Sequence, residues 1–426
     1  MKQNSNSRRD FIKEATIGLS AASALTFATE VHADGNDTLT VGLIGCGGRG
    51  TGAAIQALKA DRQVRLIAMG DMFEDRLQTS LKSIRKEVPE KVQVDAEHCF
   101  TGFDAYKKVI ACADVVLLCT PPGFRPLHLQ AAVEAGRHIF AEKPCAVDAP
   151  GVRSVLQSTE LAKKKKLCIA SGLCLRSSYG FRELMSRVHQ GEIGTIETIF
   201  ANDYRGTLRV VPRADKWSDM TWQLRNWYYF TWLSGDFNVE QHVHYLDVAA
   251  WAMQGIYPVR ALGMGGRQVR IAPEYGQIYD HFSVVYEYEN GTRLVSNCRQ
   301  QSKCKNEMSA QVYGTKGRAH FSERDHGLTL RAAKEWSYSG PTNNMYQTEH
   351  DELFAAIRAG KTVNNGEYMA RSTLLAIMGR MAAYTGQSIT WDMALNSQEN
   401  LLPSQLSLDA KLPEPVVPSP GITKFF

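Results

Sequence analysis

Residues 39–50, LTVGLIGCGGRG, decide the fold of this chain, because an apolar run leads straight into a turn with four glycines. The next residues, TGAAIQALKA, have the apolar spacing of a helix. A strand, a glycine-rich turn and a helix in this order form the first half of a dinucleotide-binding βαβ unit, in which the helix N-terminus faces phosphate groups. The stretch therefore predicts a Rossmann domain that binds a dinucleotide.

The glycines of this turn have separate tasks in such a unit. The first makes the tight turn, the second lets the backbone approach a pyrophosphate, and the third lets helix and strand pack closely. We therefore take the residues of the turn as candidate cofactor-binding residues: Gly45, Gly47, Gly48, Arg49 and Gly50.

An acidic residue follows at the position that a dinucleotide site requires. A second apolar run, VRLIAMGD, ends in Asp71, 21 residues after Gly50. A carboxylate there would accept hydrogen bonds from the adenosine ribose hydroxyls. Met72 comes next, and no arginine stands beside it to hold a 2′-phosphate, so the sequence favours NAD over NADP.

Two more strand-like runs complete the pattern of this domain. ADVVLLCTPP ends at Thr120 and Pro121, and AAVEAGRHIFAEKP is a helical stretch with a short strand that leads to Glu142 and Lys143. Strands that alternate with helices imply a parallel sheet whose carboxyl edge binds the cofactor. These four residues join the candidate cofactor-binding set.

Four features carry a resemblance to a known family: GCGGRG, Asp71, TPP and AGRHIFAEKP. Together they resemble the Gfo/Idh/MocA superfamily of glucose-fructose oxidoreductase and inositol dehydrogenase, over roughly residues 38–385. The resemblance implies an NAD(P)-dependent oxidoreductase with an N-terminal Rossmann domain and a C-terminal α+β domain that holds a large open mixed or antiparallel sheet. It also implies that Lys143 contacts the substrate hydroxyl and the nicotinamide ribose.

Two points around this resemblance stay open in the sequence. The family usually places a histidine closer to the threonine of TP than His128, which lies eight residues after Thr120. Lys143 precedes Pro144, which favours an extended or turn conformation at a strand end. Apart from the resemblance, a solvent-exposed lysine is the simpler interpretation of Lys143.

The second half of the chain has the pattern of an antiparallel sheet. The runs TIETIFANDYRG and DHFSVVYEYENGTRLVSNCRQQ alternate as strands do, and Asn290-Gly291 marks a hairpin. The open face of such a sheet favours self-association, so we expect a homo-oligomer. We predict four segments: an export signal (1–33), the Rossmann domain (38–155), the C-terminal substrate domain (156–385) and a tail (386–426).

Glu240, His244 and Asp247 are spaced i, i+4 and i+7, so they share one face of a helix that starts near Asp236. A carboxylate one turn away can orient an imidazole and raise its proton affinity, as a base for a sugar hydroxyl requires. The family resemblance places an Asp-x-x-x-His pair here. We predict that His244 takes the proton, Glu240 orients it and Lys143 polarises the hydroxyl. Taken alone, a helical Glu-His pair is more typical of a protein surface.

Aromatic residues crowd the segment before this pair. Four of the seven tryptophans lie between Trp217 and Trp232. They form either a stacking platform for sugar rings or a hydrophobic core or subunit contact. No metal is expected, because His242 and His244 point to different faces of a helix. The candidate substrate-binding residues are Arg176, Tyr204, Trp227 and Asp247.

The N-terminus carries three ordered features of an export signal. Residues 7–13, SRRDFIK, match the twin-arginine consensus, a weakly apolar segment covers about residues 15–28, and residues 31–33 supply a cleavage site. We expect the twin-arginine translocase to export the folded chain to the periplasm or the cell exterior. A chain exported in the folded state can carry its cofactor with it.

The composition is that of a soluble globular protein, with 44% hydrophobic and 22% charged residues. A formal net charge of +5 gives no indication of nucleic-acid binding, and the basic run at residues 163–166 is typical of a solvated helix face. Nine cysteines without a CxxC pair suggest buried thiols rather than a disulfide framework or a zinc site. Cys145, directly after EKP, is either a packed side chain or a reactive thiol.

The leading hypothesis is an exported NAD-dependent oxidoreductase that transfers a hydride from a sugar or cyclitol carbon to the nicotinamide. Outside the cytoplasm the reduced cofactor must be reoxidised in place, so we expect a tightly bound, internally recycled cofactor. One alternative is an NAD-dependent glycoside hydrolase that works through a transient keto-sugar. A second alternative is a non-catalytic sugar-binding protein on an enzyme scaffold.

Overall fold

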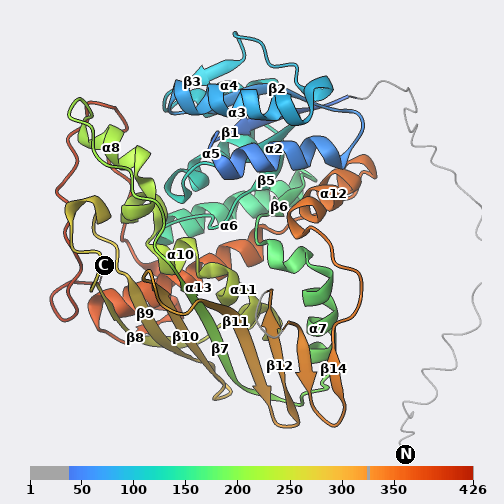
Figure 1. Cartoon of the computed structure of the whole chain (residues 1–426), viewed down its shortest axis with the longest axis vertical. Helices are drawn as coiled ribbons and strands as arrows, with labels where there is room; N and C mark the ends of the chain where they lie inside the picture. The colour runs from blue at the N-terminus through green and yellow to red at the C-terminus, as the bar shows by residue number, and fades with distance from the viewer. Residues whose placement is uncertain (1–37, 324–326, 426) are drawn as a thin grey trace, which may run out of the picture. The chain divides into compact units, whose positions relative to one another are not determined.

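Alternating strands and helices in the first part of the chain build a parallel six-stranded sheet (Figure 1). The computed structural model describes residues 38–323 and 327–425, and the predicted export signal lies outside them. The strand order β3-β2-β1-β4-β5-β6, with every neighbouring pair parallel, is that of a dinucleotide-binding Rossmann fold. The predicted N-terminal fold is therefore confirmed.

The strands of this sheet are short and the helices between them are longer. The strands are β1 (Leu39–Ile44), β2 (Val64–Asp71), β3 (Cys99–Thr101), β4 (Val115–Leu118), β5 (His138–Ala141) and β6 (Ile169–Ser171). The helices are α2 (Gly48–Ala60), α3 (Glu74–Glu87), η1 (Pro89–Lys91), α4 (Ala105–Cys112), η2 (Pro122–Phe124), α5 (Arg125–Glu134) and α6 (Ala149–Lys164).

The apolar runs form the central strands because helices cover both faces of the sheet. All four residues of β4 are buried. Val115 and Leu117 pack in one hydrophobic cluster with α2, whereas Val116 and Leu118 pack in another with α5. A strand that alternates between two buried faces has no polar side, which is why its sequence is continuously apolar.

The first domain takes in chain beyond residue 155, where the sequence placed its end. That position falls inside α6, and β6 follows α6 to complete the sheet. Helix α12 (Met345–Arg358) also packs against α2, β5 and β6, although it comes much later in the chain. The C-terminal part of the chain thus returns to cover the first sheet.

A nine-stranded mixed sheet forms the second domain, as expected. Its order is β14-β13-β12-β11-β7-β10-β9-β8-β15, and among these pairs only β7 and β10 run parallel. Asn290-Gly291 lies in the predicted hairpin between β9 and β10, with Gly291 at a φ of 86°. The strands are β7 (Ile196–Arg205), β8 (Arg260–Gly266), β9 (His281–Glu287), β10 (Arg293–Gln300), β11 (Glu307–Gly314), β12 (Gly317–Ser322), β13 (Thr329–Arg331), β14 (Glu335–Ser337) and β15 (Ile389–Thr390).

Helices lie on one face of this sheet, between it and the first domain (Figure 1). Helix α13 packs on β8 and β9 and also on α6, and seventeen of its residues are buried. One hydrophobic cluster runs from α5 and α6 through α13 to the inner face of the sheet. The helices are η3 (Cys174–Ser177), α7 (Tyr179–His189), α8 (Asp219–Arg225), η4 (Trp227–Tyr229), α9 (Thr231–Ser234), α10 (Phe237–Glu240), α11 (Val243–Ala252), η5 (Pro273–Tyr275), α12, α13 (Gly366–Thr385) and α14 (Trp391–Asn396).

The other face of the sheet carries exposed apolar side chains. Leu262 and Met264 on β8 are 56% and 72% exposed. The tail after α14 crosses the second domain as an extended segment, where Leu402 and Leu412 pack on the aromatic segment around η4. Among the helices of the described ranges, none combines the length and the apolar character needed to cross a bilayer.

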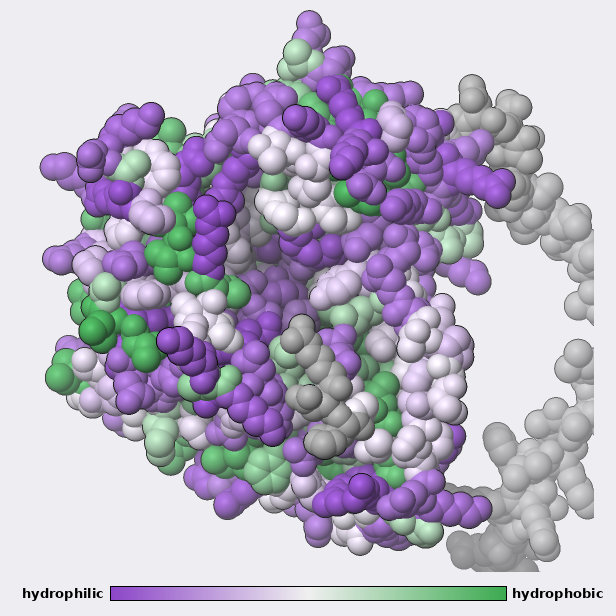
Figure 2. Space-filling model, viewed as in Figure 1, coloured by the Kyte–Doolittle hydropathy of each residue, from purple (hydrophilic) through white to green (hydrophobic). Residues whose placement is uncertain are grey.

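Figure 2 shows a hollow in one face of the molecule, between the first domain and the nine-stranded sheet, lined largely by hydrophilic residues. The carboxyl edge of the parallel sheet faces the second domain. The fold therefore brings the glycine-rich turn, the EKP segment and the segment from α8 to α11 toward one another.

Candidate functional site

The glycine-rich turn has the geometry that its sequence predicts. Gly45 has a φ of 96°, and a Cβ atom there would lie 2.6 Å from the backbone of Cys119 and Thr120. A Cβ atom on Gly50 would lie 1.9 Å from the backbone oxygen of Gly45. Any side chain at these two positions would separate β1 from β4 or from α2.

The other two glycines leave room for a ligand. Added Cβ atoms on Gly47 and Gly48 would meet nothing within 4 Å. Helix α2 begins here, and its N-terminus has no side-chain cap and no acidic residue in the first turn. An uncapped helix N-terminus with open backbone in front of it fits the pyrophosphate of a dinucleotide.

Asp71 lies at the end of β2, beside this turn. Its carboxylate accepts hydrogen bonds from the backbone N–H groups of Cys46 (2.7 Å) and Phe73 (2.9 Å). Burial raises the pKa of Asp71 above its usual value, and these two hydrogen bonds oppose that rise. The carboxylate is therefore fixed at the mouth of the turn, at the place expected for the adenosine ribose.

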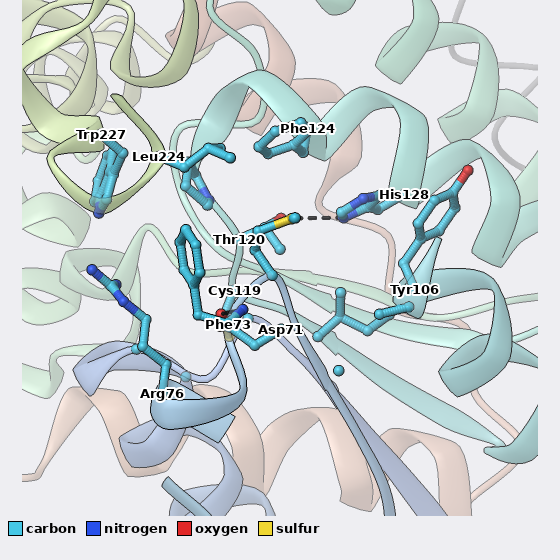
Figure 3. A pocket seen from close by; sticks show the side chains of 18 of the residues that line it. Asp71, Phe73, Arg76, Tyr106, Cys119, Thr120, Phe124, His128, Leu224 and Trp227 are labelled. Atoms are coloured by element: carbon cyan, nitrogen blue, oxygen red, sulfur yellow. Dashed lines mark hydrogen bonds between the residues drawn. The ribbon is translucent and has the colours of Figure 1, made fainter. Parts of the chain in front are cut away.

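A cavity of about 220 Å³ joins these elements (Figure 3). Eight of the ten predicted cofactor-binding residues line it; the other two, Glu142 and Lys143, are not part of its wall. The eight lining residues are Gly45, Gly47, Gly48, Arg49, Gly50, Asp71, Thr120 and Pro121.

The loop after β4 is held by two buried side chains. The hydroxyl of Thr120 lies 3.2 Å from Nδ1 of His128, whose ring stacks on Tyr106. Burial, together with the charge of Arg125, lowers the pKa of His128 to about 3. Arg125 donates to the backbone oxygens of Leu118 and Thr120. Arg125 and His128 thus both contact Thr120, and the hydrogen bonds of Arg125 to the backbone fix the loop after β4.

Arg49 connects the glycine turn to the EKP segment and to α12. Its guanidinium pairs with Glu142, donates to Glu349 at 2.8 Å and donates to Gln56 at 2.7 Å. Burial alone would lower the pKa of Arg49, but the two carboxylates outweigh this effect and raise it. Glu142 was predicted to bind the cofactor, which stays a prediction. Its carboxylate pairs with Arg49 and accepts from the backbone N–H of Lys143 at 3.1 Å.

Lys143 reaches from the first domain to the second. Its ammonium donates to the backbone oxygen of Glu240 at 2.6 Å and to the Glu240 carboxylate at 2.9 Å. Both side chains are nearly buried, with exposed fractions of 12% and 11%. Lys143 is therefore not the solvent-exposed lysine that the sequence alone left possible.

His244 lies beside this pair with an unpartnered ring nitrogen, since its buried Nδ1 has no hydrogen bond. Burial first, and then the charges of Lys143, Arg205 and Arg49, lower the pKa of His244 well below its usual value. We predicted that Glu240 orients His244 and raises its proton affinity. The structure contradicts this, because the Glu240 carboxylate pairs with Lys143 and the surrounding cations outweigh it.

The expected single helix from Asp236 to Asp247 is also wrong. Helix α10 ends at Glu240 and α11 begins at Val243. Buried His242, between the two helices, lies with Nε2 2.8 Å from the hydroxyl of Ser296. Within residues 38–323 and 327–425, no group of three histidine, cysteine, aspartate or glutamate side chains is placed to hold a metal ion.

Arg176 and Asp247, two predicted substrate-binding residues, bind each other. Two nitrogens of Arg176 donate to the two Asp247 oxygens at 2.8 and 2.9 Å, and Ser372 donates to one of them at 2.7 Å. Asp247 is fully buried, and Arg176 lies over the ring of Tyr368. This network anchors α11 to α13, and because Asp247 has no exposed surface it is not placed to contact a substrate.

Tyr204 lies on the wrong face of the sheet for a substrate contact. Side chains of β7 alternate, and buried Asp203 faces the helices whereas Tyr204 faces outward, under Arg299. The inward residues are Asp203 and Arg205, joined by a bidentate ion pair. Arg205 is the site residue that the sequence missed, since its charge acts on His244.

Trp227 lines the cofactor cavity rather than a separate sugar platform. It shares that wall with Leu224, and both belong to the segment from α8 to η4. Most of the other aromatic residues of this segment form a buried cluster with Phe237 and Phe282. Of the two interpretations of the aromatic segment, a sugar-stacking platform or a hydrophobic core, the core therefore describes most of its residues.

All nine cysteines lie in the described residues, and none forms a disulfide. Burial raises the pKa of the Cys145 thiol to about 11, and its sulfur lies against Thr373. The thiol is therefore protonated near neutral pH, as a packed side chain would be.

Comparison with known families covers both domains. Residues 39–173 match the model described as an oxidoreductase family with an NAD-binding Rossmann fold. Residues 181–320 match the model of the GFO/IDH/MocA C-terminal domain. The two matches together cover more than half of the chain.

Individual relatives are distant. An inositol 2-dehydrogenase of Rhizobium meliloti (strain 1021) is 23% identical over 321 residues, which are 75% of this chain and 86% of that enzyme. The aldose-aldose oxidoreductase from Caulobacter crescentus superposes with a TM-score of 0.64 at 17% identity, covering 83% and 99% of the two chains. A levoglucosan dehydrogenase solved with NADH and levoglucosan superposes with a TM-score of 0.65 at 16% identity, and the match again covers 83% of this chain and 99% of that one. At these identities the structural matches show the shared fold.

Proposed function

The chain belongs to the Gfo/Idh/MocA family of NAD(P)-dependent oxidoreductases, and from this premise we propose that it oxidises a ring hydroxyl of a sugar or cyclitol. The observation that carries the proposal is the ion pair of Lys143 and Glu240 beside the unpartnered Nδ1 of His244. A cation that follows β5 of the first domain thus lies close enough to an imidazole of the second domain for its charge to act on it. This is the pair of groups that deprotonation of a hydroxyl needs.

Each of the three residues has a distinct role in this proposal. Lys143 donates to the substrate hydroxyl oxygen and lowers its pKa. The neutral imidazole of His244 accepts the proton as the carbon is oxidised. Glu240 holds the lysine ammonium in place as a positioning residue. When NAD is bound, its nicotinamide accepts the hydride.

The cations that lower the pKa of His244 also favour this chemistry. They keep the imidazole neutral near pH 7, which is the form that accepts a proton. Lys143 and Arg205 stabilise the negative charge that develops on the substrate oxygen in the same region. The low proton affinity of the base is thus offset by a more acidic hydroxyl.

The substrate class rests on the similar proteins and on the polar site. The relative from Rhizobium meliloti is named as an inositol 2-dehydrogenase, and the two structural neighbours are named for aldoses and for levoglucosan. The site itself offers charged and hydrogen-bonding groups from both domains. A polyhydroxylated ring suits such a lining.

For the cofactor, the proposal favours NAD over NADP. The fixed carboxylate of Asp71 stands where ribose hydroxyls would bind, and a 2′-phosphate there would meet its negative charge.

Export and cofactor recycling complete the proposal. The twin-arginine motif and cleavage site at residues 7–33 support export of the folded chain by the twin-arginine translocase to the periplasm or beyond. An exported enzyme needs its cofactor reoxidised without release, either by a second sugar or by return of the hydride to the first. The second route includes glycoside hydrolysis through a keto-sugar.

Self-association is proposed through the outer face of the nine-stranded sheet. The exposed Leu262 and Met264 on β8 support a contact with a second copy of this chain. Light scattering on Met264→Glu compared with the unmodified protein tests this contact.

One assay tests the function and separates its alternatives. Purified protein is mixed with inositols, monosaccharides and aryl glycosides, and the near-ultraviolet absorbance of reduced nicotinamide is followed. A rise with a sugar or cyclitol supports the oxidoreductase. Aglycone release at constant absorbance identifies the hydrolytic cycle. No change with any of these compounds would overturn the proposed activity.

A further inference from the structure

The first turn of α3 is tied to α8 of the second domain. The guanidinium of Arg225 donates to both carboxylate oxygens of Asp75, at 2.8 and 3.0 Å. The neighbouring Arg76 donates to the backbone oxygen of Arg225 at 3.1 Å. Asp75 and Arg76 follow Asp71 closely, so these contacts hold the wall of the ribose position from the opposite domain.

Aromatic rings enclose the same arginine. The Arg225 guanidinium lies 3.9 Å from the ring centre of Phe73 and 5.1 Å from that of Trp217. The Arg225 side chain is 20% exposed whereas Asp75 is 64% exposed, so the rings shield only the arginine end of the pair. The backbone N–H of Phe73 donates to Asp71. The arginine is thus joined to the predicted ribose-binding carboxylate through one residue.

The same segment closes one side of the cofactor cavity. Leu224 and Trp227, on either side of Arg225 in the chain, line the cavity together with Phe73 and Arg76. Figure 3 shows Trp227 and Leu224 entering from the second domain, opposite Phe73 and Arg76 from the first. A dinucleotide in this cavity would touch both domains at its adenosine half.

The segment around Arg225 is anchored on its outer side. Asn226 donates to the backbone oxygen of Glu274 at 2.7 Å and accepts from the backbone N–H of Val211 at 2.9 Å. Ser218, at the N-terminus of α8, donates to the backbone oxygen of Leu408 in the tail at 2.7 Å. With these anchors in place, opening the cavity on this side requires the contacts of Arg225 to break.

We propose that Arg225, together with Leu224 and Trp227, is part of the dinucleotide site, and that its pair with Asp75 is a clasp that retains the adenosine half of NAD between turnovers. The proposal deepens the proposed function, because an internally recycled cofactor requires slow release. It assigns to the aromatic segment of the second domain a role in cofactor retention rather than in sugar binding.

The test measures release of NADH from the full chain. Protein loaded with NADH is chased with excess NAD⁺, and the loss of bound-NADH fluorescence gives the release rate. Asp75→Ala removes an exposed partner without disturbing the core, and Arg225→Ala removes the other. Each is expected to release NADH about tenfold faster. Because both remove one contact, the double variant should release no faster than Arg225→Ala alone.

A matched control lies at the start of the same segment. Arg213 pairs with Asp219 at 2.8 Å and lies over Trp222, but this pair stays within the second domain. Arg213→Ala should leave the release rate unchanged. Unchanged release in both Asp75→Ala and Arg225→Ala would overturn the clasp, as would equal acceleration in Arg213→Ala. If the unmodified protein releases NADH quickly and the variants still accelerate it, the clasp stands and internal recycling fails.

Discussion

The ammonium of Lys143 lies 2.6 Å from the backbone oxygen of Glu240, a residue 97 positions further along the chain. Glu240 is the last residue of α10, so its backbone oxygen has no partner within that helix and accepts a hydrogen bond from the lysine instead. It also fixes the distance between the EKP segment and the two helices that carry Glu240 and His244. This contact thus joins the two segments that carry the proposed catalytic residues.

Replacing Lys143 should abolish turnover. We expect Lys143→Ala to lower kcat by about a thousandfold or more, because both the polarising cation and the partner of Glu240 are lost. Steady-state kinetics with the substrate found in the absorbance assay measures the effect, and thermal unfolding checks the fold. Lys163→Ala removes an exposed lysine and should change neither quantity. Full activity in Lys143→Ala would remove this lysine from the mechanism.

The acid limb of the pH profile should lie well below pH 6.5. In the proposed mechanism His244 acts in its neutral form, and burial and nearby cations lower its pKa well below 6.5. The neutral form therefore persists as the pH falls through 6.5, and kcat/KM declines only at lower pH. Arg205→Gln removes one of these cations, so it should move the acid limb toward higher pH.

The half-buried His281, which pairs with Asp280 on the nine-stranded sheet, offers the control for this measurement, since His281→Gln should leave the limb in place. An acid limb at or above pH 6.5 that does not move in Arg205→Gln would contradict the assignment of His244.

Arg49 should be a strong determinant of stability. It is the shared partner of Glu142 and Glu349, and both carboxylates are buried. Arg49→Ala leaves two buried carboxyl groups without their cation, so we expect a loss of about 3 kcal/mol in the free energy of unfolding. Chemical denaturation measures it. Glu352→Ala, in the same helix α12, breaks an exposed pair with Arg182 and should cost under about 1 kcal/mol. Equal losses of unfolding free energy in Arg49→Ala and Glu352→Ala would show that the buried Arg49 network stabilises the fold no more than an exposed ion pair does.

The sequence predicts the features that depend on local pattern. The glycine turn, the strand ending in Asp71 and the hairpin at Asn290-Gly291 each follow from short-range backbone geometry, and the structure has all three. The parallel sheet follows from the alternation of strands and helices. A continuously apolar run such as VVLL also predicts a central strand, because both of its faces must be covered by helices to bury all of its side chains.

The predictions that failed concern individual side chains, and each failure has a physical reason. Helical spacing assumes an unbroken helix, and the predicted Glu240–His244 contact fails because Lys143 takes the oxygen and carboxylate of Glu240. Tyr204 is one residue from the inward-facing position, and a shift of one residue reverses the face of a strand. The pairing of Arg49 with Glu349 spans 300 residues and has no local signature in the sequence.

Asp236, directly before α10, gives the last prediction. Its φ of 72° and ψ of 161° lie in a region that glycine occupies almost alone. The buried carboxylate holds this conformation by accepting from the backbone N–H groups of Phe237 and Tyr279 and from the Tyr384 hydroxyl. Burial, partly offset by these hydrogen bonds, raises the pKa of Asp236 from 3.8 to about 6.

The sign of the resulting pH dependence follows from proton binding. Between about pH 4 and about pH 6 the folded state holds a proton on Asp236 that the unfolded state has lost. The contribution of Asp236 to the free energy of unfolding therefore falls as the pH rises through this window, by on the order of 3 kcal/mol. Asp236→Asn cannot titrate, so the difference in stability between the two proteins should change by this amount across the window. Denaturation at a series of pH values measures it, and Asp95→Asn, at an exposed aspartate, serves as the control. A constant difference between Asp236→Asn and the unmodified protein from pH 4 to pH 7 would mean that Asp236 keeps an ordinary pKa in the fold, and that its ionised carboxylate holds the strained turn before α10 across this range.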